Sequence, residues 1–197
     1  MFLFFCSSIS TSEEVLKKIA ELPVTYYSIV RLENPQTKLL ISSFEGHYLT
    51  GSKQQVARGV NSSKQALAEL YFNLLPNNRS NVLQGDYVRC GDELTLQHTV
   101  SSGFLHSHNF TSPLQNGHEI SVYPLPGEIG NVWKIECSGD IIKFRQPFKL
   151  LNIKMNEYLS VSPKGLYPAD VGGHHELYCS DNQDYAEWFV RHGVFTS

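Results

Sequence analysis

A threefold internal repeat is the feature that most limits what this 197-residue chain can fold into. Three landmarks recur at intervals of about 55 to 65 residues: a leucine, a serine, and a large aromatic residue that ends each unit. The landmarks are Leu32, Leu96 and Leu150; Ser42, Ser107 and Ser160; and Phe72, Trp133 and Trp188. Repeats of this kind bury their apolar faces only jointly, so we predict three units that close around one axis into a single domain.

Each unit shows the alternation of short strands. In the central unit a leucine-rich run at 93–98, the motif Leu105-His106-Ser107-His108, an apolar run at 119–123 and a tryptophan run at 132–137 predict four strands. Glycine and proline, which are common in turns, are scattered along the chain, and aromatic residues make up 12% of it. Both features also favour many short strands. Residues 63–70 have a helix-forming composition, and we expect one helical turn there.

Residues 1–23 precede the repeats. Their apolar start, Met1–Cys6, and the serines that follow are typical of a short secretory signal without a basic start; the alternative is a disordered or tucked-in apolar tail. An amphipathic helix that ends before Pro23 is predicted next, with these apolar residues on one face: Val15, Leu16, Ile19 and Leu22. We expect this helix to pack on the domain that follows, with partner binding as the alternative.

The charge balance argues against a nucleic-acid partner. Sixteen basic and nineteen acidic residues give a net charge of -3, which is too balanced for the basic patches that dominate binding to phosphates. No apolar run approaches the roughly 18 to 20 residues that a membrane span needs. We therefore predict no nucleic-acid partner and no membrane span.

Cysteines and glycosylation motifs bear on the compartment. The four cysteines lack CxxC spacing, so a structural zinc site is not expected: Cys6, Cys90, Cys137 and Cys179. Cys90 and Cys137 bracket the central unit, and a disulfide between them would close a long loop in an oxidising compartment; two ordinary buried thiols are the alternative. Three Asn-x-Ser/Thr motifs agree with a lumenal chain, at Asn61, Asn78 and Asn109.

The combined pattern resembles the MIR repeat, which protein O-mannosyltransferases, inositol trisphosphate receptors, ryanodine receptors and the stromal cell-derived factor 2 proteins share. The resemblance rests on the leucine strand, the LHSH motif, the terminal tryptophan, and the strand openings Gln55-Val56, Glu119-Ile120-Ser121 and Glu176-Leu177-Tyr178. The resemblance is strongest to the stromal cell-derived factor 2 proteins, and it covers residues 24–195. It implies an all-β fold, a β-trefoil of three MIR repeats at about 24–80, 81–138 and 139–197, with a short N-terminal helix before it.

The resemblance also implies a role. Members of this family act in the lumen of the endoplasmic reticulum, where they associate with the resident Hsp70 chaperone, a J-domain co-chaperone and misfolded client proteins, and they are linked to O-mannosylation. The C-terminal residues 192–197 contain no KDEL-type retrieval signal, so we expect residence in the lumen to require a partner, or the chain to be secreted. A non-functional leader would leave the chain in the cytoplasm.

The central unit alone keeps both histidines of the motif. Leu40-Ile41-Ser42-Ser43 takes its place in the first unit, and Tyr158-Leu159-Ser160-Val161 in the third. His106 and His108 fall on one face of a strand. We interpret them first as groups that fasten loops to the barrel through hydrogen bonds. The functional alternative is recognition of a glycan or peptide, with polar neighbours at Asn109, Thr111 and Ser112.

Metal binding and catalysis find little support. A metal would need a third ligand, and nothing in the spacing demands one among the candidates His98, His118, His174 and His175. The sequence has no G-x-S-x-G, G-x-x-x-x-G-K or H-E-x-x-H motif. We therefore predict a module that is not an enzyme and needs no cofactor, to which the family resemblance adds a role in protein folding quality control. The alternatives are a carbohydrate-binding trefoil for mannosylated ligands and an accessory recognition domain of a protein O-mannosyltransferase.

Overall fold

The computed structural model describes residues 12–61, 67–77, 81–167 and 173–196. Within them, α1 (Ser12–Ala20) precedes twelve strands and two short 3₁₀ helices. The strands are β1 (Ile29–Glu33), β2 (Leu40–His47), β3 (Gln55–Val60), β4 (Phe72–Pro76), β5 (Glu93–His98), β6 (Phe104–Thr111), β7 (His118–Tyr123), β8 (Trp133–Cys137), β9 (Phe148–Asn152), β10 (Glu157–Leu166), β11 (His175–Ser180) and β12 (Glu187–Val194). The 3₁₀ helices are η2 (Leu67–Leu70), which supplies the predicted helical turn, and η3 (Ile129–Asn131).

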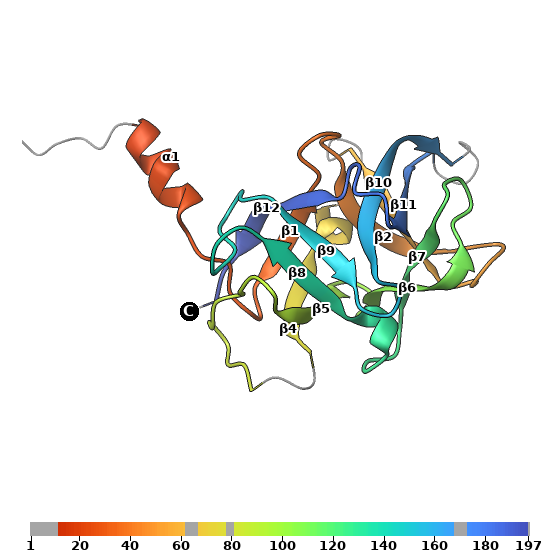
Figure 1. The fold of residues 1–197 in the computed structure, drawn as a ribbon, viewed down its shortest axis with the longest axis horizontal. Coiled ribbons are helices and arrows are strands. Elements are labelled where there is room, and N and C mark those ends of the chain that lie inside the picture. Colours follow the sequence, from red (N-terminus) through yellow and green to blue (C-terminus); the bar gives the residue numbers. More distant parts are fainter. Residues whose placement is uncertain (1–11, 62–66, 78–80, 168–172, 197) are drawn as a thin grey trace, which may run out of the picture.

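Six strands close into a barrel. The antiparallel pairings run from β1 to β4, β5, β8, β9 and β12 and then return to β1. Every barrel strand therefore has a neighbour on both sides, and the barrel leaves no open sheet edge. Figure 1 shows these strands in the left and central part of the view.

Three hairpins, β2–β3, β6–β7 and β10–β11, cover one end of the barrel, on the right in Figure 1. The hairpins also pair with one another in a triangle, β3 with β7, β7 with β11, and β11 with β3. A six-stranded barrel with a triangle of hairpins is a β-trefoil, so the predicted fold class is confirmed. Each unit contributes two barrel strands and one hairpin.

The two tryptophans have equivalent surroundings. Trp133 and Trp188 are both fully buried. The indole Nε1 of Trp133 donates a 2.9 Å hydrogen bond to the carbonyl oxygen of Leu105, and that of Trp188 does the same to Leu159. Phe72 fills the corresponding place in the first unit without a donor. The aromatic landmarks of the sequence therefore mark one repeated core position.

The same turn follows the first strand of every unit. A buried polar residue opens each turn: Asn34, His98 or Asn152. Its carbonyl accepts the backbone N–H of a residue four positions later, which has a φ of 63°, 59° or 54°: Lys38, Ser102 or Asn156. Three non-glycine residues in the left-handed region at matching positions show that the backbone itself repeats, because this conformation is sparsely populated by such residues.

The hairpin register corrects the predicted alignment of the repeats by one residue. The landmark set placed Ser107 with Ser42 and Ser160. The strand pairings instead place His106 with Ser42 and Ser160, and Ser107 with Ser43 and Val161. The tryptophan hydrogen bonds agree, because they make Leu105 equivalent to Leu159. A shift of one residue turns a side chain to the other face of a strand, and only the pairing partner fixes the register.

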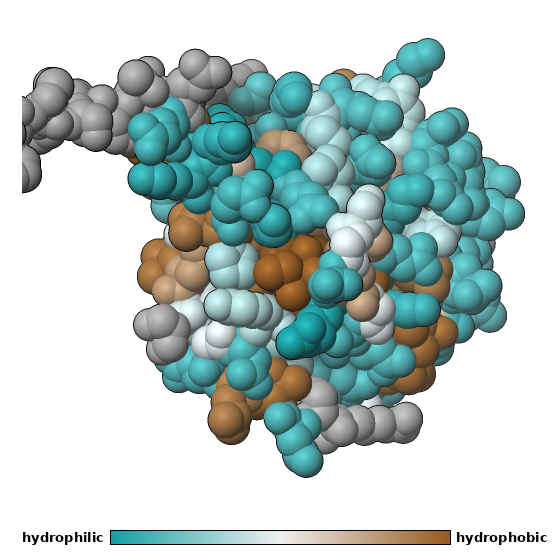
Figure 2. All heavy atoms as spheres, turned by 60° about the vertical axis from the view of Figure 1, so that its left-hand side comes forward, coloured by the Kyte–Doolittle hydropathy of each residue, from teal (hydrophilic) through white to brown (hydrophobic). Residues whose placement is uncertain are grey.

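Helix α1 stands away from the barrel (Figure 1, red). Its apolar side chains are exposed by 43% at Val15, 59% at Leu16 and 38% at Ile19, so the expectation that it packs on the domain is wrong. The chain enters the core after the helix, at Val24 and Tyr26, which are buried. Figure 2 brings this side of the molecule forward and shows mainly polar residues, with apolar residues at the centre, on the left and along the lower part of the face.

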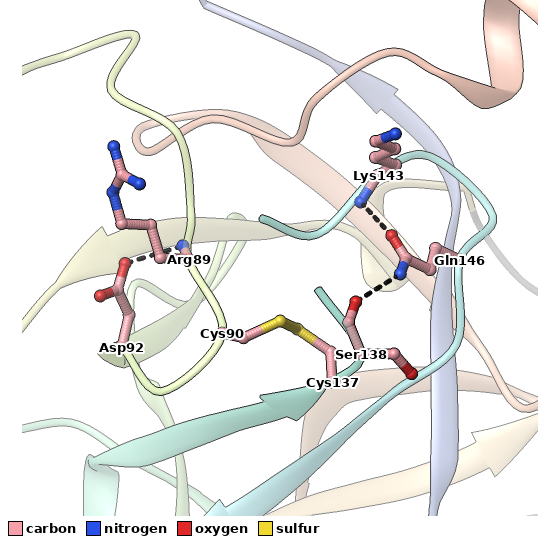
Figure 3. Close-up of a disulfide and its surroundings, with 7 residues drawn as sticks. All are labelled: Arg89, Cys90, Asp92, Cys137, Ser138, Lys143 and Gln146. Atoms are coloured by element: carbon pink, nitrogen blue, oxygen red, sulfur yellow. Dashed lines mark hydrogen bonds between the residues drawn. A yellow bond between two sulfur atoms is a disulfide. The ribbon is translucent and has the colours of Figure 1, made fainter. Parts of the chain in front are cut away.

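Cys90 and Cys137 form a disulfide whose Cα atoms lie 5.4 Å apart (Figure 3). The bond joins the segment before β5 to the end of β8. Cys179 is a buried free thiol, and burial raises its pKa. Cys6, like the rest of the apolar start, lies outside the described residues.

Polar contacts hold the backbone on both sides of the disulfide (Figure 3). The backbone N–H of Arg89 donates to the Asp92 carboxylate over 2.8 Å. The Gln146 side chain donates to the carbonyl of Ser138 over 2.9 Å and accepts the N–H of Lys143 over 3.1 Å. The disulfide is therefore set in an ordered group of turns.

Candidate functional site

His106 is enclosed within the central unit. The side chain is buried, and its Nδ1–H donates a 2.7 Å hydrogen bond to Oδ1 of Asn131. The ring of Tyr123 lies 5.0 Å away, and Gly130 packs so closely that a Cβ there would come within 2.4 Å of the imidazole. Burial lowers the pKa of His106 to about 4, so the ring is neutral at pH 7.

His108 is bound to a buried carboxylate. Its Nε2 lies 3.0 Å from Oε1 of Glu119, and both side chains are buried. The same carboxylate accepts a hydrogen bond from the hydroxyl of Ser52, in the loop between β2 and β3. A buried carboxylate is tolerated when it is hydrogen-bonded, and here its partners tie the central hairpin to the first one. Both motif histidines therefore fasten structural elements together.

The other predicted ligand residues divide into exposed and buried ones. Asn109 and Thr111 are exposed, whereas Ser112 is buried and accepts the N–H of Gln115 over 3.3 Å. Phe110 lies between the first two, 45% exposed, with its ring centroid 4.9 Å from that of His108. This segment therefore exposes an aromatic ring and, next to it in sequence, two polar residues.

Three of the four histidines considered as further metal ligands have partners of other kinds. His118 pairs through Nδ1 with Glu157 at 2.7 Å, and His175 Nδ1 donates to the carbonyl of Ser162 over 2.9 Å. His98 bonds to its own turn. Over the described ranges, no three histidine, cysteine, aspartate or glutamate side chains come together as a set that could hold a metal ion.

The glycosylation motifs remain predictions. Asn61 and Asn109 are both exposed. Asn78 lies outside the described residues.

Sequence reasoning missed a pair of buried carboxylates. Glu119 of β7 and Glu176 of β11 occupy equivalent positions, and Val56 takes that position in β3. Glu176 accepts hydrogen bonds from the Leu114 N–H over 2.9 Å and the Tyr167 hydroxyl over 3.2 Å, and burial raises its pKa. The signal was the similarity of the strand openings at 119–121 and 176–178, but a glutamate is ordinarily assigned to the surface.

A pocket of about 480 Å³ opens between the first and third hairpins. Its walls include Phe44, Tyr48, Leu49, Arg58, Tyr167 and His174. The Arg58 guanidinium lies 4.0 Å from the centre of the Phe44 ring, and the rings of Tyr167 and His174 are 4.8 Å apart. None of the residues predicted to bind a glycan or peptide lines this pocket, whereas His174, considered as a metal ligand, does. The sequence offered one sign of it, Gly173-His174-His175, which reads more simply as a turn.

A larger hollow of about 770 Å³ lies beside the disulfide and the end of α1. Basic groups on its walls, Arg89, Lys143 and Arg145, are offset by Glu21 and Asp140. Lys143 and Glu21 form an ion pair there. The hollow is more open and more polar than the aromatic pocket, and ligand pockets are usually mostly apolar with few polar groups, so the smaller aromatic pocket is the better candidate.

Comparisons with known proteins agree with one another. No protein-family model matches the chain. The chain is 30% identical over 178 residues to the stromal cell-derived factor 2-like protein of Arabidopsis thaliana, covering 87% of this chain and 80% of that protein. It is 29% identical over 179 residues to stromal cell-derived factor 2-like protein 1 of Homo sapiens, covering 89% and 79%.

Solved structures give the same answer for the fold. The crystal structure of the Arabidopsis thaliana protein is similar with a TM-score of 0.82 and 27% identity, over 88% of this chain and 97% of that one. A Pmt1-Pmt2 protein O-mannosyltransferase complex of S. cerevisiae is similar with a TM-score of 0.74 and 23% identity, over 90% and 27%. The designed threefold protein ThreeFoil has a TM-score of 0.51 at 12% identity, over 82% and 96%. The last two likenesses concern the fold alone. Among the residues described here, no helix has the length and hydropathy to cross a bilayer.

Proposed function

The chain belongs to the stromal cell-derived factor 2 family, and from this premise we propose that it is a non-enzymatic module of protein folding quality control. In this proposal it works in the lumen of the endoplasmic reticulum with an Hsp70 chaperone, a J-domain co-chaperone and misfolded client proteins, and is linked to their O-mannosylation. The observation that carries the proposal is the similarity to family members over most of the chain.

Two structural features support this role. The disulfide between Cys90 and Cys137 suits an oxidising compartment such as the lumen. The side chains best suited to acid–base chemistry, His106, His108 and Glu119, are buried and bound to internal partners, which favours a scaffold over an enzyme. Fold alone does not assign function, so the role needs a direct test.

Capture from a lumenal extract tests the proposal. The full chain carrying a C-terminal tag serves as bait, and ThreeFoil, a threefold protein of similar fold, serves as the control bait. We expect the chain to recover the Hsp70 and the J-domain protein reproducibly, and the control to recover neither. Absence of both from the eluate, with the bait folded, would overturn the proposed role.

The lumenal location requires its own measurement. We propose that the apolar start directs the chain into the secretory pathway. Mass determination of the mature amino terminus, together with localisation of the full chain, distinguishes the outcomes. A cytosolic, uncleaved product would remove the lumenal role and leave the fold unaffected.

A second candidate function is recognition of mannosylated ligands by the central hairpin, either alone or as an accessory to a protein O-mannosyltransferase. It is favoured by the exposed Phe110, because an exposed aromatic ring can stack on the apolar face of a sugar. An N-glycan on Asn109 would cover this same surface, so the two uses exclude each other.

An array of mannosylated peptides tests this second function. We expect binding that is lost in Phe110→Ala and kept in Leu114→Ala, which removes another exposed apolar side chain of the same loop. Absence of binding to every mannosylated ligand would argue against it. Equal loss of binding in Phe110→Ala and Leu114→Ala would argue against a specific role of Phe110.

A further inference from the structure

We infer that the pocket between the first and third hairpins binds an aromatic side chain with one hydrogen-bond donor, a tryptophan or tyrosine in an unfolded polypeptide segment. This inference rests on the proposed function and specifies the chemistry of the client contact. The motif histidines of the central unit do not line this pocket.

The walls of the pocket favour an aromatic occupant over a sugar. Phe44, Tyr48 and Tyr167 supply ring surfaces. The hydroxyls of the two tyrosines already have internal acceptors, since Tyr48 donates to the carbonyl of Ile120 over 2.8 Å and Tyr167 donates to Glu176 over 3.2 Å. A sugar would find few partners for its hydroxyls, whereas a planar ring would bury apolar area against other rings.

His174, in the wall of the pocket, has a buried ring nitrogen without a partner among the described residues. Within the described part of the chain, Nδ1 of His174 is buried without a hydrogen bond. Burial, together with the charge of Arg58, lowers the pKa of His174 to about 4, so the imidazole is neutral at pH 7. In the neutral tautomer that carries its proton on Nε2, Nδ1 is an acceptor, and an unmet buried polar atom is costly. The N–H of an indole or the O–H of a phenol would satisfy it.

The charge of the pocket complements an electron-rich ring. Its ionisable lining groups in the described residues are His47, Arg58 and His174, apart from the tyrosines, and no carboxylate lines it. Arg58 is held by Glu69 at 2.8 Å and by the face of Phe44, so its guanidinium is fixed in place. A guanidinium attracts the negative face of an aromatic ring and repels lysine or arginine. Leu49, 82% exposed at the rim, offers further apolar contact to flanking residues.

Fluorescence anisotropy with labelled peptides tests the inference. The probes are fluorescein-labelled glycine–serine octapeptides that carry one central Trp, Tyr, Phe or Ala. We expect the full chain to bind the Trp peptide at least about tenfold more tightly than the Ala peptide. The single hydrogen bond to His174 adds a preference for Trp over Phe of about threefold to tenfold.

Two variants assign the binding to this pocket. His174→Phe keeps a ring of similar size and should abolish the preference for Trp over Phe. Thr50→Trp, at an exposed position on the pocket wall, should fill the pocket and abolish binding. Thr111→Trp is the matched control, since Thr111 is exposed on the central hairpin and does not line the pocket. Circular dichroism verifies that each variant is folded.

The outcomes separate this inference from the proposed function. Equal affinity for the Ala and Trp peptides, or unchanged Trp-peptide binding in folded Thr50→Trp, would overturn the inference. Recovery of the Hsp70 and J-domain partners in the capture experiment would still support the proposed function in that case. A clear peptide preference without recovered partners would support the pocket and remove the proposed partners.

Discussion

Trp133 and Trp188 hold the same position in two units of the barrel, and each indole N–H donates a 2.9 Å hydrogen bond to the carbonyl of a leucine in the neighbouring hairpin. Those leucines, Leu105 and Leu159, are themselves equivalent in register. The bond joins barrel to hairpin within each unit. In the first unit Phe72 fills the place by packing alone.

Replacing either tryptophan by phenylalanine should lower the free energy of unfolding by about 1–3 kcal/mol. The change removes buried ring atoms and leaves a buried carbonyl without its donor. Urea denaturation of Trp133→Phe and Trp188→Phe measures the two losses. The threefold equivalence predicts similar values, and a large loss in one with none in the other would contradict it.

Lys38→Gly should raise the free energy of unfolding by about 0.5–1 kcal/mol. Lys38 is exposed and has a φ of 63°, a conformation that costs a non-glycine residue energy and that glycine adopts freely. Lys154→Gly is the matched control. Lys154 is an exposed turn residue that is not among those with a positive φ, so this variant should be less stable than the unchanged protein. Thermal denaturation of both variants gives the comparison. A loss of stability in Lys38→Gly would show that the backbone at Lys38 is not strained.

Removing the disulfide should destabilise the protein by about 2–4 kcal/mol. Cys90 and Cys137 are 47 residues apart, so the bond constrains a long loop in the unfolded chain. The measurement is chemical denaturation of the double variant Cys90→Ser, Cys137→Ser beside the oxidised protein. Reducing agent should destabilise the oxidised protein and leave the double variant unchanged, since Cys179 is buried and unbonded.

Stability should fall as the pH drops from about 6.5 towards 4. Burial lowers the folded-state pKa of His106 and of His174 to about 4, below the usual value near 6.5 in an unfolded chain. The unfolded state therefore binds protons more readily in this window, and stability present above pH 6.5 is lost on acidification. Each histidine contributes a slope of at most about 1.4 kcal/mol per pH unit.

The variant His106→Ser tests this pH dependence. Serine stands at the equivalent positions 42 and 160, so the change introduces a residue that the fold accommodates there. Urea denaturation between pH 4 and pH 7 should show a shallower slope than in the unchanged protein. His192→Ser, at an exposed position, should leave the slope as it was; an unaltered slope in His106→Ser would show that His106 does not carry it.

Much of the fold could be predicted from the sequence because it depends on patterns within each unit. The leucines at 32, 96 and 150 and the aromatic residues at 72, 133 and 188 repeat along the chain, and the structure places each set at one core position. Alternating apolar residues mark strands, since alternate side chains point to opposite faces. Units that cannot bury their own apolar faces must close together, which leads to the barrel.

The tertiary structure alone decided which side chains meet. The predicted alignment of Ser107 with Ser42 and Ser160 was wrong by one residue, because strand register depends on the partner strand. His108 and Glu119 became a buried pair joined to Ser52, and the aromatic pocket formed between hairpins of the first and third units, far apart in sequence. Sequence periodicity specifies which face of a strand a residue occupies, whereas closure of the barrel determines what lies opposite that face.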